Sequence, residues 1–348
     1  MRTKVFSLLF SCALFVPNCG YAMRGEFNID RWYGMLDSVR ARAASENISE
    51  STIKSTLHSP AFIPSIVKSD KNQAEFKLTL DGYLSRVVNP TRIAQGKKMR
   101  ATYPTMLSRV ENKYGVPPHV MLAFWGMESN YGAVKSRHKL IDAFLTLMYD
   151  GRRETFFGNQ LIALMKIADT NKLEINNIHG SWAGAMGHFQ FIPTTLAQYG
   201  ADGNSDGRID IINNIGDAMF SAGNYLNKLG WNKNERIVRR VILPADFDVS
   251  LLDGKTKLTL PQWSALGVTN PDGTVIPQNN MTAGLVADTA HITAQRATVA
   301  PDAAADSDVA PMPVITAYLT YPNFYRIKKW NNSNWYAIAI ANLADELH

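Results

Sequence analysis

The sequence predicts a mainly α-helical protein (α+β overall) with a small β-containing insert. Apolar residues recur at helical spacing over much of the region 23–237, most regularly in 140–149 and 152–168. Between 238 and 322 they form short alternating runs separated by turns, which is typical of short strands. The last segment, 323–348, ends in another helical pattern, and we expect it to return to the helical core.

The first 22 residues have the pattern of an export signal. Arg2 and Lys4 precede an apolar run that is too short to cross a bilayer, and small residues end the segment at Ala22. A lipoprotein signal ending at Cys19 is the alternative, but Pro17 makes a poor approach to a lipidated cysteine. We therefore expect a periplasmic protein that is cleaved after Ala22.

The composition describes a globular protein that does not depend on disulfides. Hydrophobic residues make up 46% and charged residues 19% of the 348 residues, which excludes a disordered chain. Both cysteines, Cys12 and Cys19, lie in the leader, so the cleaved protein would have no thiol. The net charge of +6 includes two leader charges. The mild basic bias fits an anionic polymer or peripheral contact with the envelope; we expect a monomer that binds no nucleic acid.

One carboxylate, Glu128, ends an apolar helix. We expect this helix to begin at Val116-Pro117-Pro118, because proline suits the first turn, and to end at Asn130-Tyr131-Gly132, where glycine can take the left-handed cap. Phe124 and Trp125 precede Glu128 at helical spacing and share its face. Burial and the negative C-terminal pole of the helix should both raise the pKa of Glu128.

A carboxylic acid that stays protonated near neutral pH can donate a proton to a leaving group. The local sequence favours this role for Glu128 no more than its alternative, which is a partly covered surface glutamate or a structural ion pair.

Residues 179–195 form a stretch rich in glycine and small residues, which we call the glycine-rich loop. Such residues allow close approach of the backbone to a ligand. Ser181 and Gln190 are polar residues among the aromatic residues Trp182 and Phe189, a mixture that suits carbohydrate. The alternative, favoured by local context alone, is a tightly packed loop without a ligand.

The segment that starts at Asp202 matches the first half of a calcium-binding loop. Its twelfth position is Asn213 instead of glutamate, so Asp217 is the nearest following acid that can complete the site. An Asp/Gly turn without metal is the alternative. The predicted ligands of a structural Ca²⁺ are Asp202, Asn204, Asp206, the carbonyl of Arg208, and Asp217.

Four other stretches complete the prediction. They are a strand or extended arm over 76–84, a long helix over 92–114, a helix over 217–230 that stops at glycine, and a mobile loop over 288–313.

Together these stretches resemble the B-type lytic murein transglycosylases, the MltB family. The resemblance covers roughly residues 29–347. It is carried by Gly126-Met-Glu-Ser-Asn-Tyr-Gly132, by the 180–193 part of the glycine-rich loop, by the 202–217 loop with Ala222-Gly-Asn-Tyr-Leu, and by Asn323-Phe-Tyr with the 330–337 segment.

This resemblance implies a lysozyme-like helical core with an N-terminal helical lobe and a small β insert. It implies cleavage of the β-1,4 bond between N-acetylmuramic acid and N-acetylglucosamine in peptidoglycan glycan strands. In the family one glutamate, here Glu128, acts as acid and then as base, and the product carries a 1,6-anhydro ring, with no cofactor needed for the chemistry. The sugar-binding residues implied by motif match are Ser181, Gln190, Tyr225, Asn331 and Tyr336.

Two rival interpretations stand beside this one. A hydrolytic muramidase would cleave the same bond with water as the attacking group. A non-catalytic peptidoglycan-binding scaffold of the envelope would keep the aromatic and polar residues but would not need Glu128.

Overall fold

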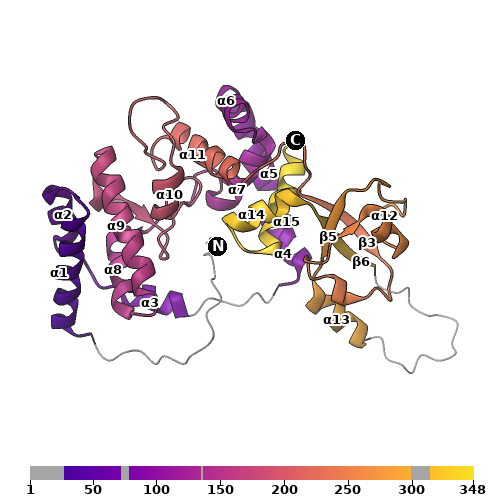
Figure 1. Ribbon diagram of the computed structural model, residues 1–348, viewed down its shortest axis with the longest axis horizontal. Helices are drawn as coiled ribbons and strands as arrows, with labels where there is room; N and C mark the ends of the chain where they lie inside the picture. Colours follow the sequence, from indigo (N-terminus) through magenta and orange to yellow (C-terminus); the bar gives the residue numbers. More distant parts are fainter. Residues whose placement is uncertain (1–26, 72–77, 135, 299–313) are drawn as a thin grey trace, which may run out of the picture. The chain divides into compact units, whose positions relative to one another are not determined.

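The computed structural model describes residues 27–71, 78–134, 136–298 and 314–348. The predicted leader and the part of the predicted mobile loop from 299 to 313 lie outside the described residues. Within them, no helix has both the length and the apolar character needed to cross a membrane. The mainly helical fold class is confirmed: helices predominate, with a four-stranded sheet and a two-stranded sheet (Figure 1).

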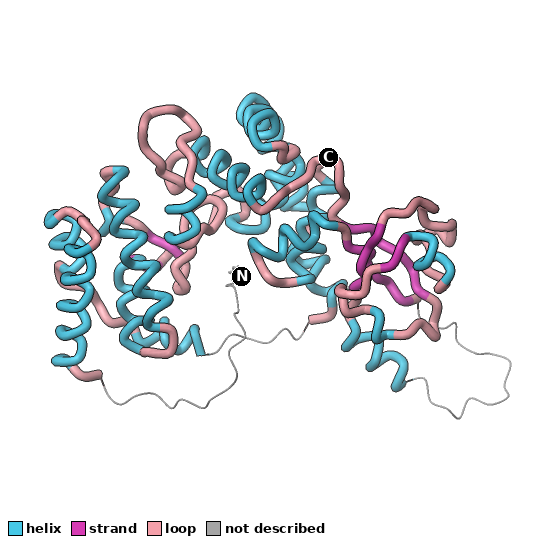
Figure 2. The backbone as a smooth tube through the Cα atoms, in the orientation of Figure 1, coloured by secondary structure: helices cyan, strands magenta, loops and turns pink. Residues whose placement is uncertain are grey.

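The chain divides into two compact units. The first unit comprises Met1–Glu75, Ala94–Lys228 and Leu347, and the second comprises Phe76–Ile93, Leu229–Glu346 and His348. Among the described residues the longer strands belong to the second unit, whereas the first consists of helices joined by loops, with one short two-stranded sheet (Figure 2).

The first unit is built from helix pairs with buried apolar faces. The apolar runs 140–149 and 152–168 form α8 and α9, which pack against each other, while α6 packs on both α7 and α11. The helices are α1 (Ile29–Ser45), α2 (Glu50–Leu57), α3 (Pro64–Lys71), α5 (Pro90–Thr102, which begins in the second unit), α6 (Pro104–Tyr114), α7 (Pro118–Ser129), α8 (Leu140–Asp150), α9 (Glu154–Asn171), α10 (Pro193–Tyr199) and α11 (Ile215–Lys228). The two-stranded sheet pairs β1 (His138–Lys139) with β2 (His179–Gly180), and the short 3₁₀ helix η1 spans Ile175–Asn177.

The second unit is organised around an antiparallel sheet in the order β3-β6-β5-β4. Its strands are β3 (Val238–Leu243), β4 (Leu258–Thr259), β5 (Thr282–Val286) and β6 (Ile315–Thr320). Its helices are α4 (Leu80–Val87), α12 (Leu260–Ala265), α13 (Thr289–Thr298), α14 (Pro322–Trp330) and α15 (Asn334–Glu346), with a 3₁₀ turn at Val249–Leu251.

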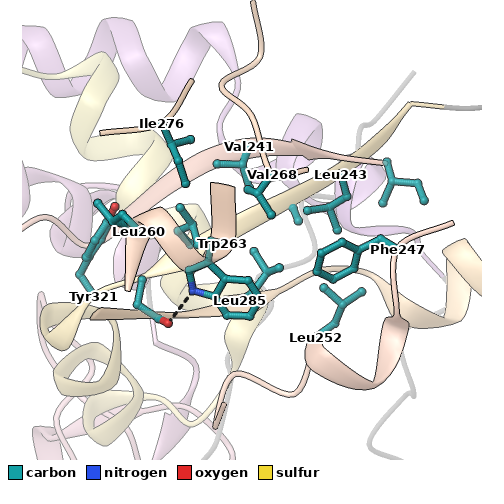
Figure 3. Close-up of a cluster of buried hydrophobic side chains, with 14 of the residues drawn as sticks. Val241, Leu243, Phe247, Leu252, Leu260, Trp263, Val268, Ile276, Leu285 and Tyr321 are labelled. Carbon is teal, nitrogen blue, oxygen red and sulfur yellow. Dashed lines mark hydrogen bonds between the residues drawn. The ribbon is translucent and has the colours of Figure 1, made fainter. Parts of the chain in front are cut away.

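One buried cluster holds this sheet against α12. Trp263 is completely buried at its centre, and its indole N–H donates to the carbonyl of Ala283 on β5 at 2.9 Å (Figure 3). Leu285 on β5 and Val241 on β3 contribute apolar side chains to the same cluster. This cluster covers one face of the sheet, and Tyr318, Thr320 and Val286, whose positions alternate with those of the cluster, are buried as well.

Three predicted elements were wrong. Leu80–Val87 is a helix instead of a strand, because the side chain of Thr79 caps it by accepting from Gly82 N at 3.2 Å and Leu80, Tyr83 and Val87 bury one helical face. The predicted helix 92–114 is two helices, because Pro104 starts a new one. Residues Thr289–Thr298 of the predicted mobile loop are helical.

The expected boundaries at 237 and 322 also differ from the two units. Helices α14 and α15 belong with the sheet in the second unit, and α15 packs on α4. Contacts between segments so far apart in sequence leave no local pattern, so composition alone could not place these boundaries.

Candidate active site

Helix α7 carries Glu128 on its last turn. Pro118 opens the helix as predicted, and the side chains from Val120 to Trp125 are buried, so this helix forms part of the core. Glu128 itself is partly buried. Because side chains three residues apart share a helical face, Glu128 is on the same face of α7 as the buried Trp125.

The helix ends within the predicted stop, but its left-handed cap is Asn130, two residues before the predicted glycine, Gly132. Asn130 takes the left-handed conformation (φ 51°, ψ 51°), and Tyr131 and Gly132 follow with positive φ as well. Asparagine tolerates this conformation better than most residues, which explains why the cap does not need the glycine.

The two glycines of this motif make room for specific side chains. A Cβ on Gly126 would lie 2.7 Å from the ring of Tyr131, and one on Gly132 would lie 2.6 Å from the imidazole of His188. The chain after α7 can therefore fold back over the helix end, and the glycine-rich loop can approach it closely.

The glycine-rich loop pairs with itself and with β1. Gly180 pairs with His138, and isolated bridges then link Gly180 to Met186 and Met186 to Phe191. The hydroxyl oxygen of Ser181 accepts the backbone N–H of Ala183 at 3.3 Å and of Ala185 at 3.0 Å. Ser181 is buried, and its hydroxyl oxygen supports the loop as the acceptor of both bonds.

Gln190 lies in the C-terminal part of this loop, and Tyr225 on α11 contacts the loop at Phe191. Gln190 has a positive φ of 49°, and its side-chain N–H donates to the carbonyl of Gly187 at 2.9 Å, which fixes the side chain against the loop. The Tyr225 ring, on α11, lies 5.9 Å from that of Phe191 and stacks on Tyr199 at 4.5 Å.

Four of the predicted catalytic and sugar-binding residues belong to the first unit: Glu128 on α7, Ser181 and Gln190 on the glycine-rich loop, and Tyr225 on α11. The other two, Asn331 and Tyr336, are buried in the second unit, around the turn between α14 and α15. There, Tyr336 N donates to Ser333 Oγ at 3.2 Å. Their roles in sugar binding stay predictions.

His188 is a residue of this site that the sequence analysis did not single out. It accepts the indole N–H of Trp125 at Nδ1, 3.0 Å away, although the two residues are far apart in sequence. No spacing rule could have found this pair, since the only local signal was the position of His188 inside the glycine-rich loop.

Hydrogen bonds from backbone N–H groups to side chains of the same loop stabilise the turns of the predicted calcium loop. The carboxylate of Asp202 accepts the backbone N–H of Gly207 at 2.8 Å, and that of Asp206 accepts the N–H of Arg208 at 2.9 Å. Backbone N–H donors, that of Gly207 most of all and then that of Ser205, lower the pKa of Asp202, so this carboxylate is ionised at neutral pH. Ca²⁺ binds oxygen ligands, both ionised carboxylates and neutral carbonyls.

Asp217 has a different place in this loop. It is completely buried, and its two oxygens accept the backbone N–H groups of Gly203 and Asp210, each at 2.8 Å. Burial raises its pKa, although these two bonds oppose the shift. Among the described residues, no three His, Cys, Asp or Glu side chains gather around one point, so the predicted acids do not already converge. The oxygen-donor chemistry fits calcium, and Asp217 braces the loop.

Comparison with known proteins decides the family. A family described as "Transglycosylase SLT domain" matches residues 32–345, which is most of the chain. The chain belongs to this family. The match confirms the resemblance read from the four motifs, and it includes both units of this transglycosylase-family protein.

Individual relatives agree with this membership. The chain is 29% identical over 268 residues to the membrane-bound lytic murein transglycosylase B of Escherichia coli K12, a match that covers 75% of this chain and 65% of that protein, just under two thirds of its length. The fold of the present chain is similar to that of SltB3 from Pseudomonas aeruginosa, solved in complex with NAG-anhNAM-pentapeptide. The TM-score is 0.79 and the identity 33%, and the match covers 91% of this chain and 79% of that chain.

A second solved structure contains calcium. The E. coli lytic transglycosylase Slt35, in a structure described as a complex with calcium, is 25% identical and has a TM-score of 0.73; the match covers 91% of this chain and 92% of that chain.

Proposed function

We propose that this protein is a murein lytic transglycosylase that cleaves the β-1,4 bond between N-acetylmuramic acid and N-acetylglucosamine. The observation that carries the proposal is the place of Glu128. It is a partly buried acid in the last turn of α7, which ends at the left-handed cap Asn130, next to the glycine-rich loop. Family membership supports it, as do the P. aeruginosa relative's complexes with NAG-anhNAM-pentapeptide and NAG-NAM-pentapeptide.

In the proposed reaction, the Glu128 carboxyl donates its proton to the glycosidic oxygen as the bond from that oxygen to the anomeric carbon breaks. The N-acetyl group of the substrate stabilises the anomeric carbon. The 6-hydroxyl oxygen of the muramoyl residue then bonds to that carbon, and the Glu128 carboxylate accepts the hydroxyl proton. Glu128 returns to its starting state, and no water is consumed.

The reaction with a single carboxyl group is supported by the absence of a second acid in the motifs. Neither the α7 sequence nor the glycine-rich loop contains another Asp or Glu. Hydrolytic glycosidases ordinarily need a second carboxylate, either as nucleophile or to activate water. An internal hydroxyl nucleophile removes that need, since it is held next to the anomeric carbon by the sugar itself.

The products test this proposal. We expect mass spectrometry of murein digested by the purified protein to find 1,6-anhydromuramoyl ends, which are lighter by one water than reducing ends. Reducing muramic ends would support the hydrolytic muramidase instead. Protein that binds sacculi and releases no fragments would support the scaffold.

We also propose that the 202–217 loop binds Ca²⁺ as a structural ion, through Asp202, Asn204, Asp206, the Arg208 carbonyl and Asp217. The bound ion would cross-link the loop and supply no step of the reaction. A ligand present at about 100 times its Kd stabilises the native state by about 2.7 kcal/mol. We therefore expect calcium to raise the melting temperature, and Asp206→Ala to lose this effect.

Asp37→Ala, which removes an exposed acid of α1, is the matched control and should respond to calcium as the wild type does. Equal melting temperatures with calcium and with chelator in the wild type would remove the site.

For localisation we propose export to the periplasm, with the leader removed after Ala22. The E. coli relative is named as membrane-bound, which keeps a lipid anchor at Cys19 as the alternative. We expect intact mass measurement of the exported protein to give a chain that begins at Met23. A mass that includes a lipidated Cys19 would reverse this assignment.

A further inference from the structure

His188 lies where three segments of the first unit meet. Its imidazole Nδ1 accepts the indole N–H of Trp125 at 3.0 Å, and its carbonyl accepts the hydroxyl of Ser129 at 2.6 Å. Its own backbone N–H donates to the carbonyl of Ile211 at 3.2 Å. One residue of the glycine-rich loop therefore bonds to the end of α7 and to the 202–217 loop.

The two bonds to α7 are spaced one helical turn apart. Trp125 and Ser129 lie on one face of the helix, and Glu128 is the residue directly before Ser129. Two hydrogen bonds one turn apart restrict both the rotation of the last turn about the helix axis and its position along that axis. Helix ends otherwise tend to fray. The Ser129 hydroxyl also accepts the backbone N–H of Gly132 at 2.9 Å, so the segment after the helix is held at the same point.

The bond to Trp125 defines the protonation state of His188. An indole N–H can only donate, so Nδ1 must be the unprotonated nitrogen and the proton must lie on Nε2. Burial lowers the pKa of His188, and the negative charge of Asp210 opposes this shift only in part. The acceptor nitrogen thus stays available at neutral pH.

The ring of His188 has little freedom to move. It packs edge-on against Trp125, with ring centroids 5.6 Å apart, and it fills the space in which a Gly132 side chain would lie. The imidazole therefore acts as a rigid spacer between the glycine-rich loop and the end of α7.

We infer that His188 is a positioning residue for the reaction: it holds the Glu128-bearing turn of α7 in register with the glycine-rich loop. The inference depends on the proposed role of Glu128. Displacing a catalytic group by about 1 Å can lower a rate by about 100-fold.

The test compares two substitutions at His188 in the full-length chain. His188→Phe keeps a ring but removes the acceptor, and we expect kcat for murein cleavage to fall by about tenfold or more while KM changes less than about twofold. His188→Asn places an amide oxygen near the position of Nδ1, and we expect it to recover most of the loss. His58→Phe, at an exposed histidine, is the matched control and should keep wild-type kcat.

Trp125→Phe removes the donor of the same bond. If the bond carries the effect, the double variant with His188→Phe should be no slower than the slower single variant. The indole N–H signal that Trp125→Phe removes from the ¹⁵N spectrum should shift in His188→Phe and stay near its wild-type position in His188→Asn. This readout reports the bond without the reaction.

Three results would overturn the inference: a kcat for His188→Phe within twofold of wild type, additive effects in the double variant, or an equal loss in His188→Asn. These outcomes are distinct from failure of the proposed function, which would appear as retained activity in a Glu128→Gln variant.

Discussion

The Glu128→Gln variant is expected to lose murein-cleaving activity by a factor of about 10³ or more. General acid–base catalysis contributes about 10²–10⁴-fold for one positioned group, and the proposed reaction uses this group for both proton transfers. Glutamine has nearly the same shape and can keep polar contacts, but it cannot give up a proton to the glycosidic oxygen. Release of anhydro-ended fragments, followed by mass spectrometry, measures the loss.

Glu174→Gln is the matched control for this experiment, since Glu174 is exposed and lies outside the site motifs. It should keep activity within about twofold of wild type, as surface substitutions usually do. The Glu128→Gln variant should still bind sacculi and melt as the wild type does. Activity that survives the substitution would show that another group is the acid.

The Trp263→Ala variant is expected to destabilise the second unit by about 3–5 kcal/mol, the usual cost of truncating a buried Trp to Ala. Trp263 is completely buried, packs near Phe247, and donates its N–H to the Ala283 carbonyl. Truncation leaves a cavity in the cluster of Figure 3 and an acceptor on β5 without its donor.

Hydrogen exchange measured by mass spectrometry would locate this loss. We expect faster exchange over 238–286 and little change over 140–171 in the first unit. Leu266→Ala, at the exposed C-cap of the same helix, should cost less than about 0.5 kcal/mol. Unchanged protection of β3 and β5 in Trp263→Ala would contradict the central role of this side chain.

Much of the fold could be predicted because the signals are local. Pro118 marks the start of α7, apolar periodicity marks α8 and α9, and the alternating runs mark the sheet of the second unit. The errors occurred where two local signals compete. In Leu80–Val87, an alternating start concealed a helical face that only its buried neighbours reveal, and at Pro104 the helical pattern continued through a break.

The candidate site divides in the same way. Glu128, the glycine-rich loop and the metal loop have short motifs, so their residues could be named in advance. The structural place of Asp217 could not be predicted. It is completely buried, and it stabilises the loop by accepting the backbone N–H groups of Gly203 and Asp210. The bond between Trp125 and His188 was equally hidden.

The amino-acid sequence by itself determined the family, the mainly helical class and the identity of the proposed acid, because each of these depends on residues that are close together along the chain. Only the tertiary structure decided which distant segments share a unit and which side chain holds the end of α7. Those choices depend on packing and hydrogen bonds between residues such as Trp125 and His188, whose separation in sequence leaves no periodic trace.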